Sequence, residues 1–391
     1  MTKKKLLFVN NNMNIGGVQK SLCNLLKEIS EDYDITLFLF SATGEYMNEL
    51  PQNIKIVKCS GIYKYFGISQ GECKTATHRI VRGCLAALTR IVRRDSVIKI
   101  MNVFQKAQKD VYDFSISFLQ NGGKKSFYGG CNDFVLYKTK AKQKVTFLHC
   151  DYGLCGANYK VNNAKYKKFD KIAACSEGCK KAFVRCVDID PKKVFTVNNC
   201  NDYERIKNLA ESNPVEYDKN AVNIVSVARL SHEKGIERGI KAVHHAVNNG
   251  INIKYHLVGD GPQRNTLKEL CNDLKISENV IFYGNSDNPY RYMKNADLLL
   301  IPSYHEAAPL VIDEARCLGL PILSTETTSS WDMIVNTDSG WVCKNNQEDL
   351  INLICNTASK KESLSQKKHQ MQQRESNNEN ALQNFYCMLN R

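Results

Sequence analysis

The chain has 391 residues, of which 43% are hydrophobic and 24% are charged, so it is long enough for two or three domains and too apolar to be disordered. No apolar run reaches the roughly 18–20 residues that a membrane-spanning helix needs, which excludes an integral membrane protein. The net charge of +14 is uneven, because residues 1–199 hold 33 Lys and Arg against 16 Asp and Glu, and the rest hold 21 against 24. The basic first half favours an anionic partner: a nucleic acid, a membrane surface or a small molecule.

The first half alternates short apolar runs with helical patterns. Residues 5–9 have the composition of a doubly buried parallel strand, and a Gly16-Gly17 loop then leads into a helical pattern over residues 21–29. Further strands are predicted at residues 35–40, 54–57, 114–118, 144–148 and 171–174. This alternation predicts a parallel sheet covered by helices, in a Rossmann-like domain of residues 1–200.

Residues 72–109 form a distinct basic segment within that domain. They carry nine Lys and Arg against two acids, interleaved with apolar residues such as Ile80, Leu88 and Ile91. This pattern predicts a basic amphipathic helical segment. Such a segment is either an ordinary solvated helix face or a contact with an anionic membrane surface. In the second case the cations expected to face the membrane are Arg79, Arg82, Arg90, Arg93 and Arg94.

The second half repeats the strand–helix rhythm, with strands predicted at residues 223–227, 253–258, 280–283, 296–302 and 321–324. It predicts a second Rossmann-like domain of residues 201–370, linked to the first near residues 198–218, where polar residues cluster. Apolar residues return near the end, so residues 371–391 are expected to form a terminal helix that packs on a distant part of the fold. Two such domains leave a cleft lined by the carboxyl ends of strands, where open α/β sheets bind ligands.

The sixteen cysteines indicate a reducing compartment. The N-terminal apolar run is too short for an export signal, and no Cys-x-x-Cys motif occurs. The closest spacings, Cys150 with Cys155 and Cys175 with Cys179, lack the second His/Cys pair of a zinc site. We therefore expect reduced thiols and a cytoplasmic protein.

A segment after the predicted strand 296–302 has the residue types of a phosphate-binding helix start. It contains Glu306, Ala308, Pro309, Leu310, Val311 and Glu314. Proline suits the first helical turn, the next two N–H groups form an anion site, and the small residue lets the backbone approach a ligand. The two glutamates suit hydrogen bonds to sugar and ribose hydroxyls, although either can be an ordinary helix cap.

Two cations precede this segment in the chain. Arg229 comes just after the strand 223–227, with one alanine between, and Lys234 comes five residues later beside a predicted helix start. Two cations at a strand end can neutralise a diphosphate, and a guanidinium can bind it bidentately. A structural ion pair is the alternative for Arg229. The glycine-rich turn at residues 259–262 permits close backbone approach, a property that plain turns share.

These elements together resemble a known enzyme family. The series comprises Arg229…Lys234-Gly235, Gly259-Asp260-Gly261-Pro262, Phe282-Tyr283-Gly284, Ala296-Asp297…Pro302-Ser303 and Glu306…Glu314, in this order, within residues 222–343. It resembles the retaining nucleotide-sugar glycosyltransferases of the family 4 type, or glycosyl transferases group 1. The N-terminal half resembles them more loosely. The resemblance implies the GT-B fold, in which two Rossmann-like domains face each other across a cleft and the C-terminal helix returns to the N-terminal domain.

The resemblance also implies roles for individual residues. Arg229 and Lys234 would hold the donor's diphosphate, Glu306 the transferred sugar, Glu314 the ribose, and the backbone at Gly259 and at Tyr283-Gly284 would lie along the donor and its base. The helix start at Ala308, Pro309, Leu310 and Val311 would bind the donor phosphates. In the first half, Gly16 and Gly17 would approach those phosphates, and His149 would lie near the sugar, unless it is a structural histidine.

We expect no metal and no cofactor, because the two cations and a helix N-terminus already supply positive potential. Asp188 and Asp190 have the form of an Asp-x-Asp metal motif, but they precede Pro191 in a predicted turn and are interpreted as structural. One departure from the family concerns residues 327–332, Thr-Thr-Ser-Ser-Trp-Asp, where relatives commonly have Gly-Gly. It leaves the details of donor binding open.

The expected function is transfer of a hexose or N-acetylhexosamine, with retention, from a UDP-sugar to a lipid-linked or growing glycan acceptor in bacterial surface polysaccharide biosynthesis. The basic half would rest on anionic lipid at the inner face of the cytoplasmic membrane. Two alternatives stay open: a sugar-nucleotide epimerase of the same architecture, and a non-catalytic module that binds sugar nucleotides or membranes. Nucleic-acid binding ranks last, because no recognition motif accompanies the positive charge.

Overall fold

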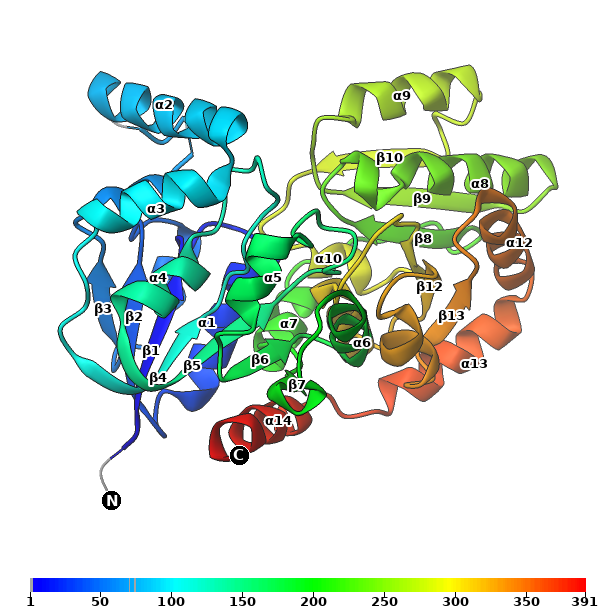
Figure 1. Ribbon diagram of the computed structural model, residues 1–391. Helices are drawn as coiled ribbons and strands as arrows, with labels where there is room; N and C mark the ends of the chain where they lie inside the picture. The colour runs from blue at the N-terminus through cyan, green and yellow to red at the C-terminus, as the bar shows by residue number, and fades with distance from the viewer. Residues whose placement is uncertain (1–2, 70, 74) are drawn as a thin grey trace. The chain divides into compact units, whose positions relative to one another are not determined.

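Two parallel β-sheets organise the chain, one in each of two units. The computed structural model describes residues 3–69, 71–73 and 75–391. Unit 1 comprises Met1–Cys200 and Asn378–Arg391, and unit 2 comprises Asn201–Asn377. Each sheet is covered by helices (Figure 1). The strand–helix alternation in the sequence therefore predicts the α/β class and the two Rossmann-like sheets correctly.

Unit 1 has seven parallel strands in the order β3-β2-β1-β4-β5-β6-β7. Their bounds are Lys5–Asn10 (β1), Asp34–Leu39 (β2), Lys55–Lys58 (β3), Val111–Ser117 (β4), Lys140–Leu148 (β5), Lys171–Ala174 (β6) and Val194–Thr196 (β7). Leu6 and Phe8 of β1 belong to the core on one face of the sheet, and Leu7 and Val9 to the core on the other. Burial on both faces explains why this strand is apolar throughout rather than alternating.

The main helices of unit 1 are Gly17–Ile29 (α1), Ala76–Val92 (α2), Arg94–Phe104 (α3), Cys131–Lys138 (α4), Lys160–Tyr166 (α5), Glu177–Cys186 (α6) and Glu379–Asn390 (α14), with short 3-10 turns at Glu45–Glu49, Ile62–Phe66 and Pro191–Lys193. The predicted basic segment 72–109 forms α2 and α3, apart from residue 74, which lies outside the described residues. The chain changes direction between the two helices at Arg93, whose φ is 71°. Helix α2 lies on α3 (Figure 1), and Thr89 is its buried residue.

The C-terminal helix α14 packs on unit 1, as expected. Phe385 and Met388 enter the same core as β1, the Lys171 ammonium donates to the Met388 carbonyl at 2.6 Å, and Tyr386 donates to Asp32 at 2.6 Å. The expected bounds, residues 371–391, are wrong. Residues 361–372 belong to a separate helix, and α14 begins only at Glu379, because the intervening Gln-Arg-Glu-Ser-Asn-Asn sequence has no apolar face to bury.

Unit 2 has six parallel strands in the order β10-β9-β8-β11-β12-β13. Their bounds are Val222–Val227 (β8), Ile253–Val258 (β9), Val280–Gly284 (β10), Leu298–Ile301 (β11), Ile322–Thr325 (β12) and Gly340–Cys343 (β13). The helices are Tyr203–Glu211 (α7), Ile236–Asn248 (α8), Arg264–Asp273 (α9), Tyr290–Met293 (α10), Leu310–Cys317 (α11), Gln347–Ala358 (α12) and Lys361–Gln372 (α13), with a 3-10 turn at His232–Lys234 and a π-helical turn at Trp331–Val335.

The segment expected to link the domains is partly helical. The division between the units falls at Cys200 and Asn201, but helix α7 occupies Tyr203–Glu211 in the middle of the expected linker, residues 198–218. Its few apolar residues suffice, because Ile206 and Ala210 are one turn apart and both are buried. Within the described ranges, no helix is both long and apolar enough to cross a bilayer.

Candidate active site

The motif residues of unit 2 meet where its sheet reverses strand order. The chain winds outward in one direction from β8 to β10 and in the other from β11 to β13, so β8 and β11 flank the topological switch point. The loops that follow these two strands lie side by side, and the Tyr304 N–H donates to the Glu233 carbonyl at 2.9 Å. Open α/β sheets bind ligands at this position. Sequence segments about seventy residues apart are thereby brought into contact.

Lys234 and Glu306 form an ion pair across these two loops. The ammonium lies 2.6 Å from the Glu306 Oε1 atom, which also accepts a hydrogen bond from the Ser303 hydroxyl at 2.8 Å. The two side chains are 25% and 11% exposed, so the pair is held with little freedom. Together with Pro309 and Val311, they line a small cavity of about 30 Å³. A cation and a carboxylate are thus fixed within one hydrogen-bond length at the switch point.

Helix α11 starts at this cavity. Its first residue is Leu310, and Pro309 occupies the N-cap with ψ of 125°, not the first helical turn as expected, because its backbone is still extended. The N–H groups of Leu310 and Val311 lie in the first turn and have no preceding helical carbonyl to bond. The positive end of the helix dipole therefore lies beside Lys234, an arrangement suited to a phosphate group.

The other two predicted donor contacts in this region differ in exposure. Arg229 lies two residues after the end of β8 and is exposed, whereas Glu314 is only 6% exposed and accepts a hydrogen bond from the Tyr290 hydroxyl at 3.3 Å. Burial raises the pKa of the neighbouring Asp313 to about 6, although Arg316 donates to its carboxylate at 3.0 Å. Glu314 is therefore buried within the first two turns of α11, where its carboxylate already accepts the Tyr290 hydrogen bond.

Gly259 allows the backbone after β9 to pack closely against the backbone after β8. Its φ is +134°, and a Cβ atom there would lie 2.0 Å from the Ala228 carbonyl oxygen. Its N–H donates to the Gly284 carbonyl at 2.7 Å, which ties the ends of β9 and β10 together. Beside them, the Tyr283 hydroxyl lies 3.2 Å from His256 Nδ1, and burial lowers the pKa of that histidine to about 4. The backbone at Tyr283 and Gly284 therefore has a rigid support.

In unit 1, the predicted site residues lie at the carboxyl edge of the other sheet. Gly16 is the N-cap of α1 and Gly17 its first residue, after β1, and His149 directly follows β5. The His149 ring packs on Phe118 with 4.7 Å between centroids, and burial lowers its pKa to about 4. Its Nε2 atom is buried and has no hydrogen-bond partner in the described part of the chain. A bound water or a ligand hydroxyl would satisfy this nitrogen.

Arg238 was not predicted, yet it holds the loop that carries Glu306. This side chain is buried, and it donates to the Pro302 carbonyl at 3.2 and 2.6 Å, the Ser303 carbonyl at 3.2 Å and the Asn345 side chain at 2.7 Å. Its guanidinium lies 4.0 Å from the centre of the Tyr304 ring, against which His232 also stacks. In the sequence it is one arginine on an amphipathic helix, a pattern that gives no sign of burial.

The unusual segment 327–332 forms an ordered turn without glycine. The Thr327 N–H donates to the Ser330 hydroxyl at 2.9 Å, and the Trp331 indole donates to Glu326 at 3.0 Å. Ser330 is buried, and the π-helical turn follows directly. Hydroxyl hydrogen bonds therefore stabilise this loop where the sequence lacks the expected flexible residues.

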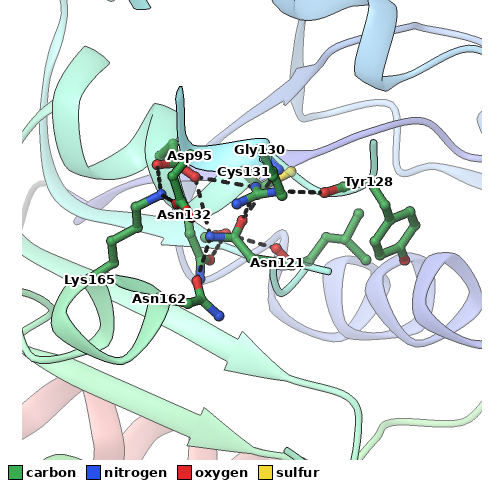
Figure 2. A network of polar contacts seen from close by, with 12 residues as sticks. Asp95, Asn121, Tyr128, Gly130, Cys131, Asn132, Asn162 and Lys165 are labelled. Atoms are coloured by element: carbon green, nitrogen blue, oxygen red, sulfur yellow. Dashed lines mark hydrogen bonds and ion pairs between the residues drawn. The ribbon is translucent and has the colours of Figure 1, made fainter. Parts of the chain in front are cut away.

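A second polar cluster lies within unit 1 and ties α3, α4 and α5 together (Figure 2). The Arg94 guanidinium contacts Asp133 at 3.3 Å and Asn121 at 2.6 Å, and the Lys165 ammonium contacts the same Asp133 at 2.7 Å. Arg94 is only 1% exposed. Arg94 was expected among the membrane-facing cations; that expectation is wrong, because this arginine pairs inward with a buried aspartate.

The comparisons with known proteins agree with this geometry. Residues 207–378 match the family described as glycosyl transferases group 1. The match covers less than half of the chain. The matched residues include Lys234, Glu306 and the start of α11, and they coincide closely with unit 2.

Curated relatives match only part of the chain. An uncharacterized glycosyltransferase of Methanocaldococcus jannaschii is 27% identical over 166 residues, covering 41% of each chain. The amylovoran biosynthesis glycosyltransferase AmsK of Erwinia amylovora is 30% identical over 129 residues, covering 31% of this chain and 32% of its own. The chain therefore spans less than two thirds of the length of the curated relatives it matches.

The fold of the whole chain is also shared. The crystal structure of Anabaena HepE in complex with UDP and glucose matches with a TM-score of 0.67 and 17% identity, over 99% of this chain and 97% of the other. At this identity the likeness shows the fold alone. The two Rossmann-like units, with the terminal helix returning to the first, are those of the GT-B fold.

Proposed function

We propose that this protein is a retaining glycosyltransferase that moves a hexose or N-acetylhexosamine from a UDP-sugar to a growing or lipid-linked glycan. The observation that carries the proposal is the Lys234–Glu306 pair beside the start of α11, at the switch point of the glycosyl transferases group 1 domain. A solved structure of the same fold holds UDP and glucose, and a relative acts in polysaccharide biosynthesis, which supports the same donor class and pathway class here.

The proposed chemistry is electrostatic. The leaving group is a nucleoside diphosphate, so negative charge grows on its oxygens as the sugar departs. Lys234, Arg229 and the N–H groups of Leu310 and Val311 supply positive potential that needs no reorganisation during the reaction. Glu306 is held by Lys234 and Ser303, and its free carboxylate oxygen would accept hydrogen bonds from sugar hydroxyls.

The remaining contacts would orient the donor. Glu314 would accept a ribose hydroxyl, and the backbone at Tyr283 and Gly284, held by Gly259, would contact the base. In unit 1, the Nε2 of His149 would accept a hydrogen bond from a sugar hydroxyl, and the N–H groups of the Gly16-Gly17 helix start would bind donor phosphate. These residues supply all the charge stabilisation that the proposal requires, so it includes no metal or cofactor.

A panel of nucleotide sugars tests the proposal. We expect one UDP-sugar to raise the melting temperature of the protein and to release UDP only when a glycan acceptor is present. UDP release with an isomerised sugar and no acceptor would identify the epimerase alternative. Binding without turnover, over a range of lipid-linked acceptors, would identify a non-catalytic binding module. Absence of any thermal shift would contradict donor binding itself.

The acceptor side of the proposal rests on helices α2 and α3. Their exposed surface combines four cations, Arg79, Arg90, Arg93 and Lys99, with the apolar side chains of Ile80, Leu88, Ile91, Val92, Ile100, Val103 and Phe104. Exposed apolar residues on a basic helix pair are typical of proteins that lie on anionic bilayers. This surface supports a lipid-linked acceptor at the inner face of the cytoplasmic membrane.

Charge reversal of this surface should weaken membrane binding. The triple variant R79E/R90E/R93E is expected to bind vesicles of anionic phospholipid at least roughly tenfold more weakly, since each basic residue near such a surface contributes about 1 kcal/mol. The matched control is K181E/R185E/K192E, which changes the charge equally at exposed positions of the same unit. Sedimentation with vesicles measures the binding of both variants. Equally weakened binding in the two variants would contradict a specific membrane-binding surface on α2 and α3.

A further inference from the structure

Two thiols in the loop after β5 lie in direct contact. The Sγ atoms of Cys150 and Cys155 are 3.1 Å apart, and the Cys150 thiol donates a hydrogen bond to the Cys155 sulfur. A disulfide needs its sulfurs about 2.05 Å apart, so a movement of about 1 Å closes the bond. The nearby Cys175 and Cys179 are also in contact, at 3.7 Å, but both of these thiols are buried.

The turn that brings the two thiols together is held by its own hydrogen bonds. The Asp151 carbonyl accepts from the N–H groups of Leu154 at 3.2 Å and Cys155 at 2.9 Å. The Asp151 carboxylate accepts from the N–H groups of Gly153 at 2.9 Å and Leu154 at 3.2 Å. Because the short loop is already folded, joining its ends costs little additional chain entropy.

The two cysteines differ in access and in acidity. Cys155 is exposed and Cys150 half-buried. The hydrogen bond from Cys150 lowers the pKa of the Cys155 thiol to about 7, and the same contact, together with burial, raises the pKa of Cys150. The thiolate is the reactive form of cysteine, so the exposed Cys155 is the attacking group and Cys150 the thiol placed to resolve it.

We propose that Cys150 and Cys155 are a reversible oxidation site for hydroperoxides. The Cys155 thiolate attacks hydrogen peroxide, the O–O bond breaks, one oxygen becomes the sulfenic acid on sulfur, and the other leaves as hydroxide and takes up a proton. The Cys150 sulfur then attacks the sulfenic sulfur, the S–O bond breaks, and hydroxide leaves with the Cys150 proton as a second water. The two thiols lose two electrons in total and the peroxide gains them. An external dithiol reverses the reaction.

The oxidation site adjoins His149. Cys150 is the next residue, and the His149 backbone N–H donates to the Gln120 side chain at 3.3 Å. Because the two residues share a peptide bond, movement of the Cys150 backbone also moves the backbone that carries the imidazole. This step rests on the proposed function, in which the His149 Nε2 atom accepts a hydrogen bond from the donor sugar. A displaced Nε2 atom would lose that hydrogen bond. Oxidation should therefore lower the rate of glycosyl transfer, and a dithiol should restore it.

Peptide mass spectrometry tests the site without any assay of activity. Cleavage after Lys144 and Lys160 places both cysteines in one peptide, while Cys175 and Cys179 fall in another. After treatment of the intact protein with hydrogen peroxide, we expect the peptide of residues 145–160 to be lighter by two hydrogen atoms and to resist alkylation. After reduction it should take up two alkyl groups. Alkylation of both cysteines after peroxide, or a link from Cys150 to Cys175, would overturn the proposal.

Two variants separate this site from general thiol oxidation. C155S removes the attacking thiol, and C84S removes an exposed cysteine on α2. Peroxide should lower the transfer rate of the wild type and C84S at least about fivefold, reversibly with dithiothreitol, and leave C155S unchanged. Equal inhibition of C155S would overturn the effect on His149. If no transferase activity exists, the proposed function fails, but the peptide masses still decide whether the disulfide forms.

Discussion

Replacing Lys234 with alanine is expected to lower kcat/KM for glycosyl transfer by roughly 10²–10³-fold, because loss of one preorganised group that stabilises transition-state charge costs about that much. The ammonium lies between the Glu306 carboxylate and the start of α11, where the donor diphosphate is proposed to bind. The dissociation constant of UDP should rise as well, since the diphosphate keeps its charge in the product complex. Steady-state kinetics and calorimetric titration with UDP measure the two effects.

The control for this prediction is K367A. Lys367 on α13 is also a partly buried lysine paired with an acid, Asp338, but that acid lies just before β13, at the opposite edge of the sheet from the site. The K367A variant should keep kcat/KM within about twofold of the wild-type value.

A structural role for Lys234 would look different. If the lysine only positions Glu306, then K234A and E306Q should have equal effects that do not add in the double variant, and UDP affinity should stay unchanged in K234A. That result would remove Lys234 from the groups that contact the donor.

The sequence predicts the strands and the donor half of the site well, for a physical reason. Strands buried on both faces are short continuous apolar runs, and the residues that end them are polar, so Arg229 and the segment from Glu306 to Glu314 are recognisable without a structure. Their meeting point also follows, because the switch point of a doubly wound sheet is set by strand order. The edge strands β7 and β13 have only three and four residues, too few to give this signal.

The sequence could not show which charged residues point inward. Arg94 and Arg93 are adjacent and chemically alike, yet one pairs with the buried Asp133 and the other is exposed, because the chain turns at Arg93. The sequence pattern similarly predicts an exposed Arg238, although this side chain donates to carbonyl groups of the loop after β11. These long cationic side chains are buried because they find partners in distant segments of the chain, and the local sequence pattern does not show those partners.

Gly235 is a position in unit 2 where an added methyl group should disturb the loop that carries Glu306. It has φ of +59°, and a Cβ atom there would lie 2.1 Å from the Pro302 carbonyl oxygen, the acceptor of Arg238. G235A is therefore expected to lower the stability of unit 2 by roughly 2–5 kcal/mol, from the left-handed backbone and the overpacking together. Because the displaced loop carries Glu306, kcat/KM should also fall by about tenfold or more.

The matched control is G250A, at the other end of helix α8. Gly250 has a similar φ of +80°, but a Cβ atom there meets no other atom within 4 Å. This substitution introduces the backbone strain without the steric clash. It should therefore lower the free energy of unfolding by only about 1–2 kcal/mol and leave kcat/KM unchanged. Thermal unfolding of both variants therefore isolates the contact with Pro302. If the two melting temperatures fall equally, the β8 and β11 loops are not packed against each other at Gly235. The contact with Pro302 then does not help to hold the loop that carries Glu306.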